Sequence, residues 1–254
     1  MNFKILLAPT KNINPFPIRQ EIVSFPFFAN EAENIVHDIK KKNAEELSHL
    51  MSISQKIAGL NLGRFQNWKK SCGNDKEFHA IQMYSGEAFK AFDFPTLNSR
   101  FYEKTQETLF ILSGLYGILK PFDLVYPYRL EMGLNYSPEA RFNNLYKFWS
   151  ERITRYLNNL ISSDELIVNL ASQEYSNVID FKKVGSRVIT PCFKELKKDK
   201  LSTVSIFSKN ARGKMARFII ENEMKSEQDL KLYNLDGYLF KEELSTDDNW
   251  VFVR

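Results

Sequence analysis

The chain has 254 residues, of which 43% are hydrophobic and 26% charged, and its formal net charge is +4. This composition is typical of a globular protein with a sizeable core and excludes a wholly disordered chain. No window approaches the roughly 18 apolar residues of a membrane span, and the apolar run after Met1 is too short for a signal peptide. We therefore expect a cytoplasmic protein that does not contact membranes.

Apolar periodicity predicts strands and helices that alternate along the whole chain. Strands are expected at residues 4–8, 81–84, 109–112, 166–171, 187–193, 202–207, 232–240 and 250–253. Helices are expected at residues 31–41, 43–51, 87–92, 98–108, 143–161 and 214–224, and a hairpin turn at 193–200. No linker or repeat divides the chain. We predict a single α/β (mixed α+β) domain over residues 1–254, with a central mixed sheet flanked by helices.

Residues 51–70 contain two short helical stretches that flank the sequence Ala-Gly-Leu-Asn-Leu-Gly at 58–63. This pattern resembles a helix-hairpin-helix, in which a tight turn presents backbone amides to a DNA phosphate. Asn61 stands where that motif usually has its second glycine. The alternative is a helical corner packed by apolar side chains. The residues predicted for DNA contact are Lys56, Gly59, Leu60, Asn61, Gly63, Arg64, Lys69 and Lys70.

A glycine turn at Ser113-Gly114 follows the buried strand at 109–112, and an extended stretch with Arg129 and Glu131 comes after it. Glycines let backbone amides approach a ligand, and Arg supplies charge, so this segment predicts an anion site. Two alternatives stay open. The glycines can serve only to turn the chain, and Arg129 with Glu131 can form a structural ion pair.

The stretch 208–217 holds four basic residues and no acid, and we place it between a strand and a helix. At a helix N-terminus, Lys209, Arg212 and Gly213 would form a phosphate site, with Arg217 adding charge. The alternative is a solvated basic turn in which Arg217 pairs with Glu221.

Polar residues follow four predicted strands and could meet at one edge of the sheet, where open α/β sheets bind ligands. They are Lys11, Ser85-Gly86, Ser113-Gly114, and Ser172 with Glu174 and Tyr175. No G-x-S-x-G, P-loop or G-x-G-x-x-G motif is present, so no classical enzyme is indicated.

The cysteines, Cys72 and Cys192, form no CxxC and are far apart in sequence, which fits a reducing compartment. The three histidines show no metal-ligand spacing with them, so we predict neither a metal site nor a cofactor. Both thiols are expected to be inert, with a peroxide-sensing cysteine as the alternative.

Several segments taken together resemble the YaaA family of peroxide-stress resistance proteins, essentially from end to end. They lie at residues 8–11, 57–61 with 64–65, 84–86, 112–117, 121–124, 127–133, 169–175 and 211–222. The family often has Ser-Pro-Ala-Lys-Thr near its N-terminus, and here Ala8 and Asn12 replace the Ser and the final Thr, while Lys11 is kept.

The resemblance implies a protein that protects against hydrogen peroxide, in part by limiting free iron and thereby oxidative damage to DNA. It also implies DNA binding through the hairpin and a positively charged cleft. The hairpin role would fall on Gly59, Leu60 and Asn61 with Lys56 and Arg64. We infer that the cleft role falls on Lys11, Arg129, Lys209, Arg212 and Arg217.

We expect a monomer whose DNA contacts show little sequence preference. A second hypothesis is an enzyme that acts on DNA or a phosphorylated small molecule, with the Gly86, Gly114 and Gly213 loops as its phosphate cradle. A third is iron binding by the protein itself, through carboxylates. DNA binding that weakens steeply with salt would favour the first hypothesis.

Overall fold

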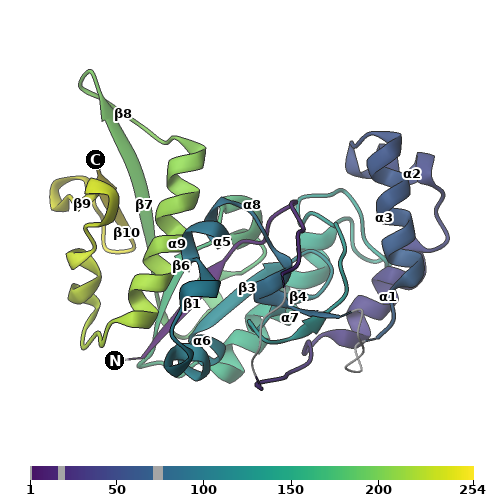
Figure 1. Cartoon of the computed structure of the whole chain (residues 1–254), viewed down its shortest axis with the longest axis horizontal. Coiled ribbons are helices and arrows are strands. Elements are labelled where there is room, and N and C mark those ends of the chain that lie inside the picture. Colours follow the sequence, from purple (N-terminus) through teal and green to yellow (C-terminus); the bar gives the residue numbers. More distant parts are fainter. Residues whose placement is uncertain (1, 17–20, 71–76) are drawn as a thin grey trace.

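The computed structural model of the chain describes residues 2–16, 21–70 and 77–254, and an eight-stranded sheet forms its centre (Figure 1). The strand order is β4-β3-β1-β6-β7-β10-β9, with β8 paired to β7. The strands are β1 (Phe3–Leu7), β3 (Leu109–Ser113), β4 (Gly117–Leu119), β6 (Leu166–Leu170), β7 (Arg187–Lys197), β8 (Lys200–Ser202), β9 (Leu239–Phe240) and β10 (Asn249–Val253). The five inner strands run parallel, and β4, β8 and β9 are antiparallel to their neighbours. The predicted mixed α/β class is confirmed.

The central strands are buried along their whole length. Every residue of Leu109–Ser113 and of Leu166–Leu170 is buried, because helices cover parallel strands on both faces. A separate two-stranded ribbon pairs β2 (Phe78–His79) with β5 (Leu124–Val125).

Helices surround this sheet, and most of the predicted helices are present. The observed α-helices are α1 (Ala29–Ile39), α2 (Ala44–Met51), α3 (Gln55–Asn67), α4 (Ala80–Met83), α5 (Glu87–Phe92), α6 (Tyr102–Thr108), α7 (Leu145–Leu160), α8 (Gln173–Ser176) and α9 (Ser205–Glu221). Asn43 caps α2 as expected, because its side chain accepts from the Glu46 amide at 2.9 Å and the Glu46 carboxylate accepts from the Asn43 amide at 2.7 Å. Helices α2 and α3 lie at the opposite end of the molecule from β7, β9 and β10 (Figure 1).

Three of the predicted strands are wrong. Residues 81–84 lie in or directly after helix α4 rather than in a strand. The alternation at 202–207 suggested a strand, but α9 begins at Ser205 and contains the whole basic stretch 208–217. Residues 232–240 are mostly short 3-10 turns, with only Leu239–Phe240 in a strand. Each of these segments is short, and tertiary packing overrides so weak a local pattern.

Helix α9 packs closely on α5 at Gly213. A Cβ built on Gly213 would lie 2.0 Å from the carbonyl oxygen of Ala88, so only glycine permits this approach. Gly63, on α3, is also inside a helix, but a Cβ there would have no neighbour within 4 Å. Packing therefore requires glycine at position 213, whereas position 63 has space for a larger side chain.

We predict that Gly213→Ala lowers the free energy of unfolding by about 1–3 kcal/mol, because the added methyl group forces α9 away from α5. Gly63→Ala is expected to raise it by about 0.5–1 kcal/mol, because alanine loses less backbone entropy in a helix. Urea denaturation of both variants measures the difference. A Gly213→Ala protein as stable as the wild type would contradict the packing described for α9.

Asp123 is a buried carboxyl in the turn directly before β5. It accepts from the Ser24 hydroxyl at 2.7 Å and from the Lys120 amide at 2.8 Å. Burial nevertheless raises the pKa of Asp123 from 3.8 to about 6. Because the pKa is higher in the folded state, the protonated carboxyl favours folding, and this contribution is lost as the pH rises through about 6.

Asp123→Asn, which cannot ionise, provides the reference for this effect. The stability of the wild type relative to Asp123→Asn is predicted to fall by about 2 kcal/mol between about pH 4 and about pH 8. Urea denaturation of both proteins at several pH values tests this. Parallel pH profiles would show that Asp123 ionises as easily in the folded chain as in the unfolded one.

Candidate functional site

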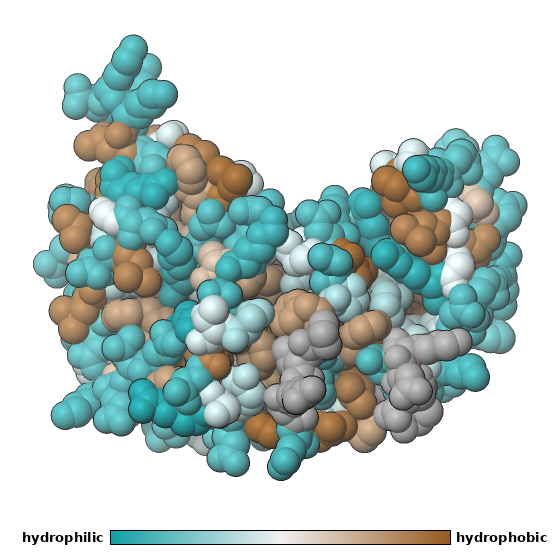
Figure 2. All heavy atoms as spheres, in the orientation of Figure 1, coloured by the Kyte–Doolittle hydropathy of each residue, from teal (hydrophilic) through white to brown (hydrophobic). Residues whose placement is uncertain are grey.

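A cleft separates the part of the molecule that carries α9 and β8 from the part that carries α2 and α3 (Figure 2). Three adjoining hollows line it, and Lys11 borders all three. The switch-point pocket is lined by residues 7–12 and 86–89, by Leu170, Ser172, Glu174 and Tyr175, and by Lys209 and Arg212. The α3 groove is lined by residues 11–14, by Ile57, Leu60, Asn61 and Arg64, and by Ser85, Lys90 and Arg129. The tyrosine cavity is lined by residues 9–11 and 128–131, and by Tyr84 and Tyr175.

The sheet topology explains the position of the switch-point pocket. Strands β1 and β6 are parallel neighbours, with Leu7 opposite Leu170 at their carboxyl ends. The chain leaves β1 towards β3 on one side and leaves β6 towards β7 on the other. The two loops therefore diverge and open a crevice, the place where open α/β sheets bind ligands.

Glu131 joins the two cations nearest the centre of the cleft. Its Oε1 accepts from Arg129 Nε at 2.9 Å and Nη2 at 2.7 Å, and lies 3.4 Å from Lys11 Nζ. The Glu131 side chain is only 7% exposed, and its Oε2 has no hydrogen-bond partner. The ion-pair alternative for Arg129 and Glu131 is thus correct in its geometry, and the pair also borders the cleft.

Tyr128 connects the tyrosine cavity to the end of β3. Its hydroxyl lies 2.6 Å from the Tyr84 hydroxyl and 2.5 Å from Ser113 Oγ, and Ser113 Oγ accepts from the Tyr116 amide at 2.8 Å. Burial raises the pKa of Tyr128 to about 12 and that of Tyr84 well above 10. These phenols therefore stay neutral and serve as hydrogen-bonding groups.

Arg212 brings a partly buried cation to the switch-point pocket from α9. Its Nε is buried and has no hydrogen-bond partner, and burial lowers the pKa of the guanidinium. Lys209 lies one turn earlier on the same helix and is exposed. A buried donor without a partner is costly, and an anion in the pocket would supply that partner. Arg212 is therefore a candidate anion-binding residue.

Arg64 brings a further cation from the opposite side of the cleft. Its Nη1 donates to Asn61 Oδ1 at 3.1 Å, and Asn61 Nδ2 donates to the Ile57 carbonyl at 2.9 Å. Burial, and then the nearby charge of Arg129, lower the pKa of Arg64. The repulsion between Arg64 and Arg129 would be relieved by an anion in the α3 groove.

Comparisons with known proteins cover nearly the whole chain. Residues 3–244 match the family model described as "Peroxide stress protein YaaA". The chain belongs to the YaaA (UPF0246) family. A UPF0246 protein of Flavobacterium johnsoniae is 41% identical over 254 residues, which cover 99% of this chain and 100% of that protein. UPF0246 proteins of Colwellia psychrerythraea and Shewanella baltica are 38% and 39% identical over 253 residues, 98% of each chain.

The fold brings many of the predicted site residues of this YaaA chain together and leaves others apart. Those that line the cleft are Lys11, Leu60, Asn61, Arg64, Ser85, Gly86, Arg129, Glu131, Lys209 and Arg212, with Ser172, Glu174 and Tyr175. Ser113 and Gly114 are buried instead, and a Cβ on Gly114 would lie 2.3 Å from the Leu130 carbonyl oxygen. Gly114 and Gly213 therefore lie at close packing contacts, and of the three glycines predicted for the phosphate cradle only Gly86 lines one of the cleft hollows.

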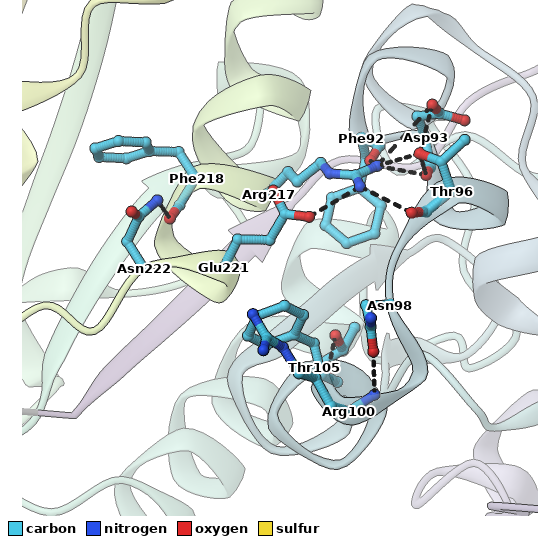
Figure 3. Close-up of polar contacts among 11 residues, drawn as sticks. Phe92, Asp93, Thr96, Asn98, Arg100, Thr105, Arg217, Phe218, Glu221 and Asn222 are labelled. Atoms are coloured by element: carbon cyan, nitrogen blue, oxygen red, sulfur yellow. Dashed lines mark hydrogen bonds and ion pairs between the residues drawn. The ribbon is translucent and has the colours of Figure 1, made fainter.

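Arg217 has a structural role that the sequence suggested only as an alternative. Its guanidinium donates to the carbonyl oxygens of Phe92 and Asp93 and to Thr96 Oγ1, at 2.7–3.1 Å, and to Glu221 Oε1 at 2.9 Å (Figure 3). It lies within α9 rather than at a helix N-terminus. Arg217 therefore fixes α9 to the end of α5 and does not line the cleft hollows.

The turn predicted at residues 58–63 is wrong, because Gln55–Asn67 is one continuous helix that contains Gly59 and Gly63. The turn between α2 and α3 lies earlier, where Ser52 has a left-handed backbone and Ser54 caps α3. Ala58, Asn61 and Phe65 are buried at helical spacing, and this packing outweighs the low helix propensity of glycine.

The remaining lysines predicted for the hairpin lie outside the three hollows. Lys56 and Lys69 are exposed, and Lys70 lies 3.8 Å from Glu33 and donates to Asn30. A role of these lysines in DNA binding stays a prediction.

Sequence reasoning missed several residues that border the cleft. Tyr84, Tyr128, Thr10 and Glu87 were not singled out, although Tyr128 stands directly before Arg129 in the most specific motif. In the described ranges, no group of three or more His, Cys, Asp or Glu side chains could hold a metal ion. No described helix is long and apolar enough to cross a membrane.

Cys192 lies on β7 beside the Arg212 guanidinium, whereas Cys72 is outside the described residues. Burial raises the pKa of the Cys192 thiol, although Arg212 and Lys194 act to lower it. The neutral thiol is a poor nucleophile, so this environment disfavours a peroxide-reactive cysteine.

In a Cys72→Ser background, iodoacetamide is predicted to alkylate Cys192 in the native protein more slowly than in the urea-unfolded protein at neutral pH. Arg212→Gln should slow the native reaction further, because it removes a cation that favours the thiolate. Mass spectrometry of timed samples follows the reaction. Equal rates in the native and unfolded chains would contradict the raised pKa.

Proposed function

We propose that this YaaA-family protein acts in the peroxide stress response by binding the DNA backbone in its cleft, and so limits iron-dependent oxidative damage to cytoplasmic DNA. The family description carries the link to peroxide stress. The observation that supports DNA as the ligand is the charge of the cleft. Six cationic side chains line the three hollows, against three carboxylates.

The arrangement of these cations suits contacts with the phosphates of the DNA backbone better than contacts with the bases. Arg64 and Arg129 come from one side of the cleft and Lys209 and Arg212 from the other, with Lys11 between them. Phosphates follow one another along a strand, so separated cations can contact successive phosphates. Such contacts position a duplex and carry no base information.

Helix α3 adds apolar contact to the same groove. Ile57 and Leu60 line it with 38% and 57% of their surface exposed. Exposed side chains of this kind can pack on deoxyribose while Arg64 holds a phosphate. The proposed contact surface of α3 is thus its side-chain face, in place of the backbone amides of a hairpin.

The double variant Arg64→Ala/Lys209→Ala is predicted to bind fluorescent duplex DNA at least tenfold more weakly at low salt, because each removed cation no longer releases counterions from a phosphate. The slope of log K against log salt should become shallower by about 0.9 for each phosphate that the variant no longer neutralises. Fluorescence anisotropy at two or more salt concentrations measures both quantities.

Arg155→Ala/Lys183→Ala provides the matched control, because these exposed cations lie on and near α7, away from the cleft hollows. It removes the same net charge and should leave affinity and slope nearly unchanged. Equal weakening in both double variants would show a diffuse charge effect. Wild-type protein that does not bind duplex, single-stranded or branched DNA at low salt would refute the proposal.

A further inference from the structure

The switch-point pocket has properties that binding of the DNA backbone does not require. Its volume is about 340 Å³, which falls in the range of small-molecule sites. It lies at the diverging carboxyl ends of β1 and β6 rather than along the surface of α3. Three cations reach it, because Lys11 enters from the β1 loop and Lys209 and Arg212 enter from α9.

Two buried polar atoms around this pocket have no protein partner. Arg212 Nε is a donor at the switch-point pocket, and Glu131 Oε2 is an acceptor at the tyrosine cavity. The two hollows adjoin, because Pro9, Thr10, Lys11 and Tyr175 line both. Leaving a buried polar group unpaired is costly, so a donor and an acceptor that both lack a partner point to a ligand that satisfies both.

We propose that the switch-point pocket binds a phosphomonoester that also carries a hydroxyl or amino donor, of the size of a sugar phosphate or nucleoside monophosphate. The phosphate contacts Arg212, Lys209 and Lys11, whose charges suit a dianion with three acceptor oxygens. The hydroxyl or amino group donates to Glu131 Oε2. Glu131 Oε1 already accepts from Arg129 and lies 3.4 Å from Lys11 Nζ, so the second oxygen is left to accept from the ligand.

The orientation follows from the placement of the charges. The phosphate cannot sit against Glu131, because two anions would repel, and a hydroxyl gains less than a phosphate from three cations. Glu87 and Glu174 also line the pocket and can accept from further hydroxyl groups of a sugar. The site therefore recognises a phosphate at one end and donors at the other.

Isothermal titration calorimetry at constant ionic strength with inorganic phosphate, ribose 5-phosphate, adenosine monophosphate and adenosine tests this. The wild type is expected to bind both phosphomonoesters more tightly than inorganic phosphate, and adenosine least. Arg212→Gln should weaken every phosphate-containing probe at least tenfold. Lys209→Gln, on an exposed side chain that does not support the fold, should weaken them in the same direction.

Glu131→Gln separates recognition of the donor from recognition of the phosphate. It should lower the ratio of ribose 5-phosphate affinity to inorganic phosphate affinity, because the amide oxygen will accept from Arg129 and leave an NH2 donor at the position of Oε2. Arg155→Gln, away from the cleft, is the matched charge control and should change nothing. No binding of any phosphate probe at millimolar concentration, or binding that Arg212→Gln and Lys209→Gln leave unchanged, would overturn the proposal.

The phosphomonoester proposal and the DNA proposal can be refuted separately. Arg64→Ala is expected to weaken DNA binding while leaving the affinity for ribose 5-phosphate intact, because Arg64 does not line the switch-point pocket. Binding of phosphomonoesters without DNA binding would refute the DNA proposal alone. DNA binding without phosphomonoester binding would refute the pocket alone.

Discussion

Contact between Gly213 of α9 and the Ala88 carbonyl of α5 positions the cations on one side of the cleft. Lys209, Gly213 and Arg217 are four residues apart and share one face of α9, with Arg212 beside them. The middle of this face packs on α5, and its end is fixed by Arg217 at Phe92 and Asp93. Its beginning extends past α5 and lines the switch-point pocket. One helix face thus supplies both the attachment and the binding groups.

Glu131 plays the corresponding role at the centre of the cleft. Without a carboxylate, Arg129 would face Lys11 and Arg64 in a region that burial has partly desolvated, where repulsion is strong. Glu131 reduces this repulsion and orients Arg129 through two hydrogen bonds to one oxygen. It leaves the cleft with an excess of positive charge and with one free acceptor oxygen. Glu131 therefore both reduces the repulsion among the cations of the cleft and provides an acceptor that a ligand can recognise.

The fold class follows from the sequence because the buried strands at 109–113 and 166–170 are apolar except for Ser113 and Asn169, and the long helix α7 has clear periodicity. The ends of parallel strands meet at one edge, which places Lys11, after β1, near Ser172, after β6. Gly86 follows α4 rather than a strand and reaches the same pocket at the start of α5. Gly59, Gly63 and Gly213 misled the local prediction, because glycine is typical of turns but also occurs inside helices. Gly213 permits close helix packing, whereas a Cβ on Gly59 or Gly63 would have no neighbour within 4 Å. Whether a glycine turns the chain or lets a helix approach depends on residues distant in sequence, such as Ala88 for Gly213.

Lys11 links the proposed functions, because its side chain borders the α3 groove, the switch-point pocket and the tyrosine cavity. One ammonium group cannot give its full charge to two anions at once. A phosphomonoester in the pocket would therefore reduce the attraction of the groove for a DNA phosphate, and DNA would reduce the affinity for the phosphomonoester by the same factor. The side chain of Lys11 is 59% exposed, so solvent screens this competition and the coupling is modest. The same lysine is held by Glu131, so a change in the Glu131 contact would alter both ligands together.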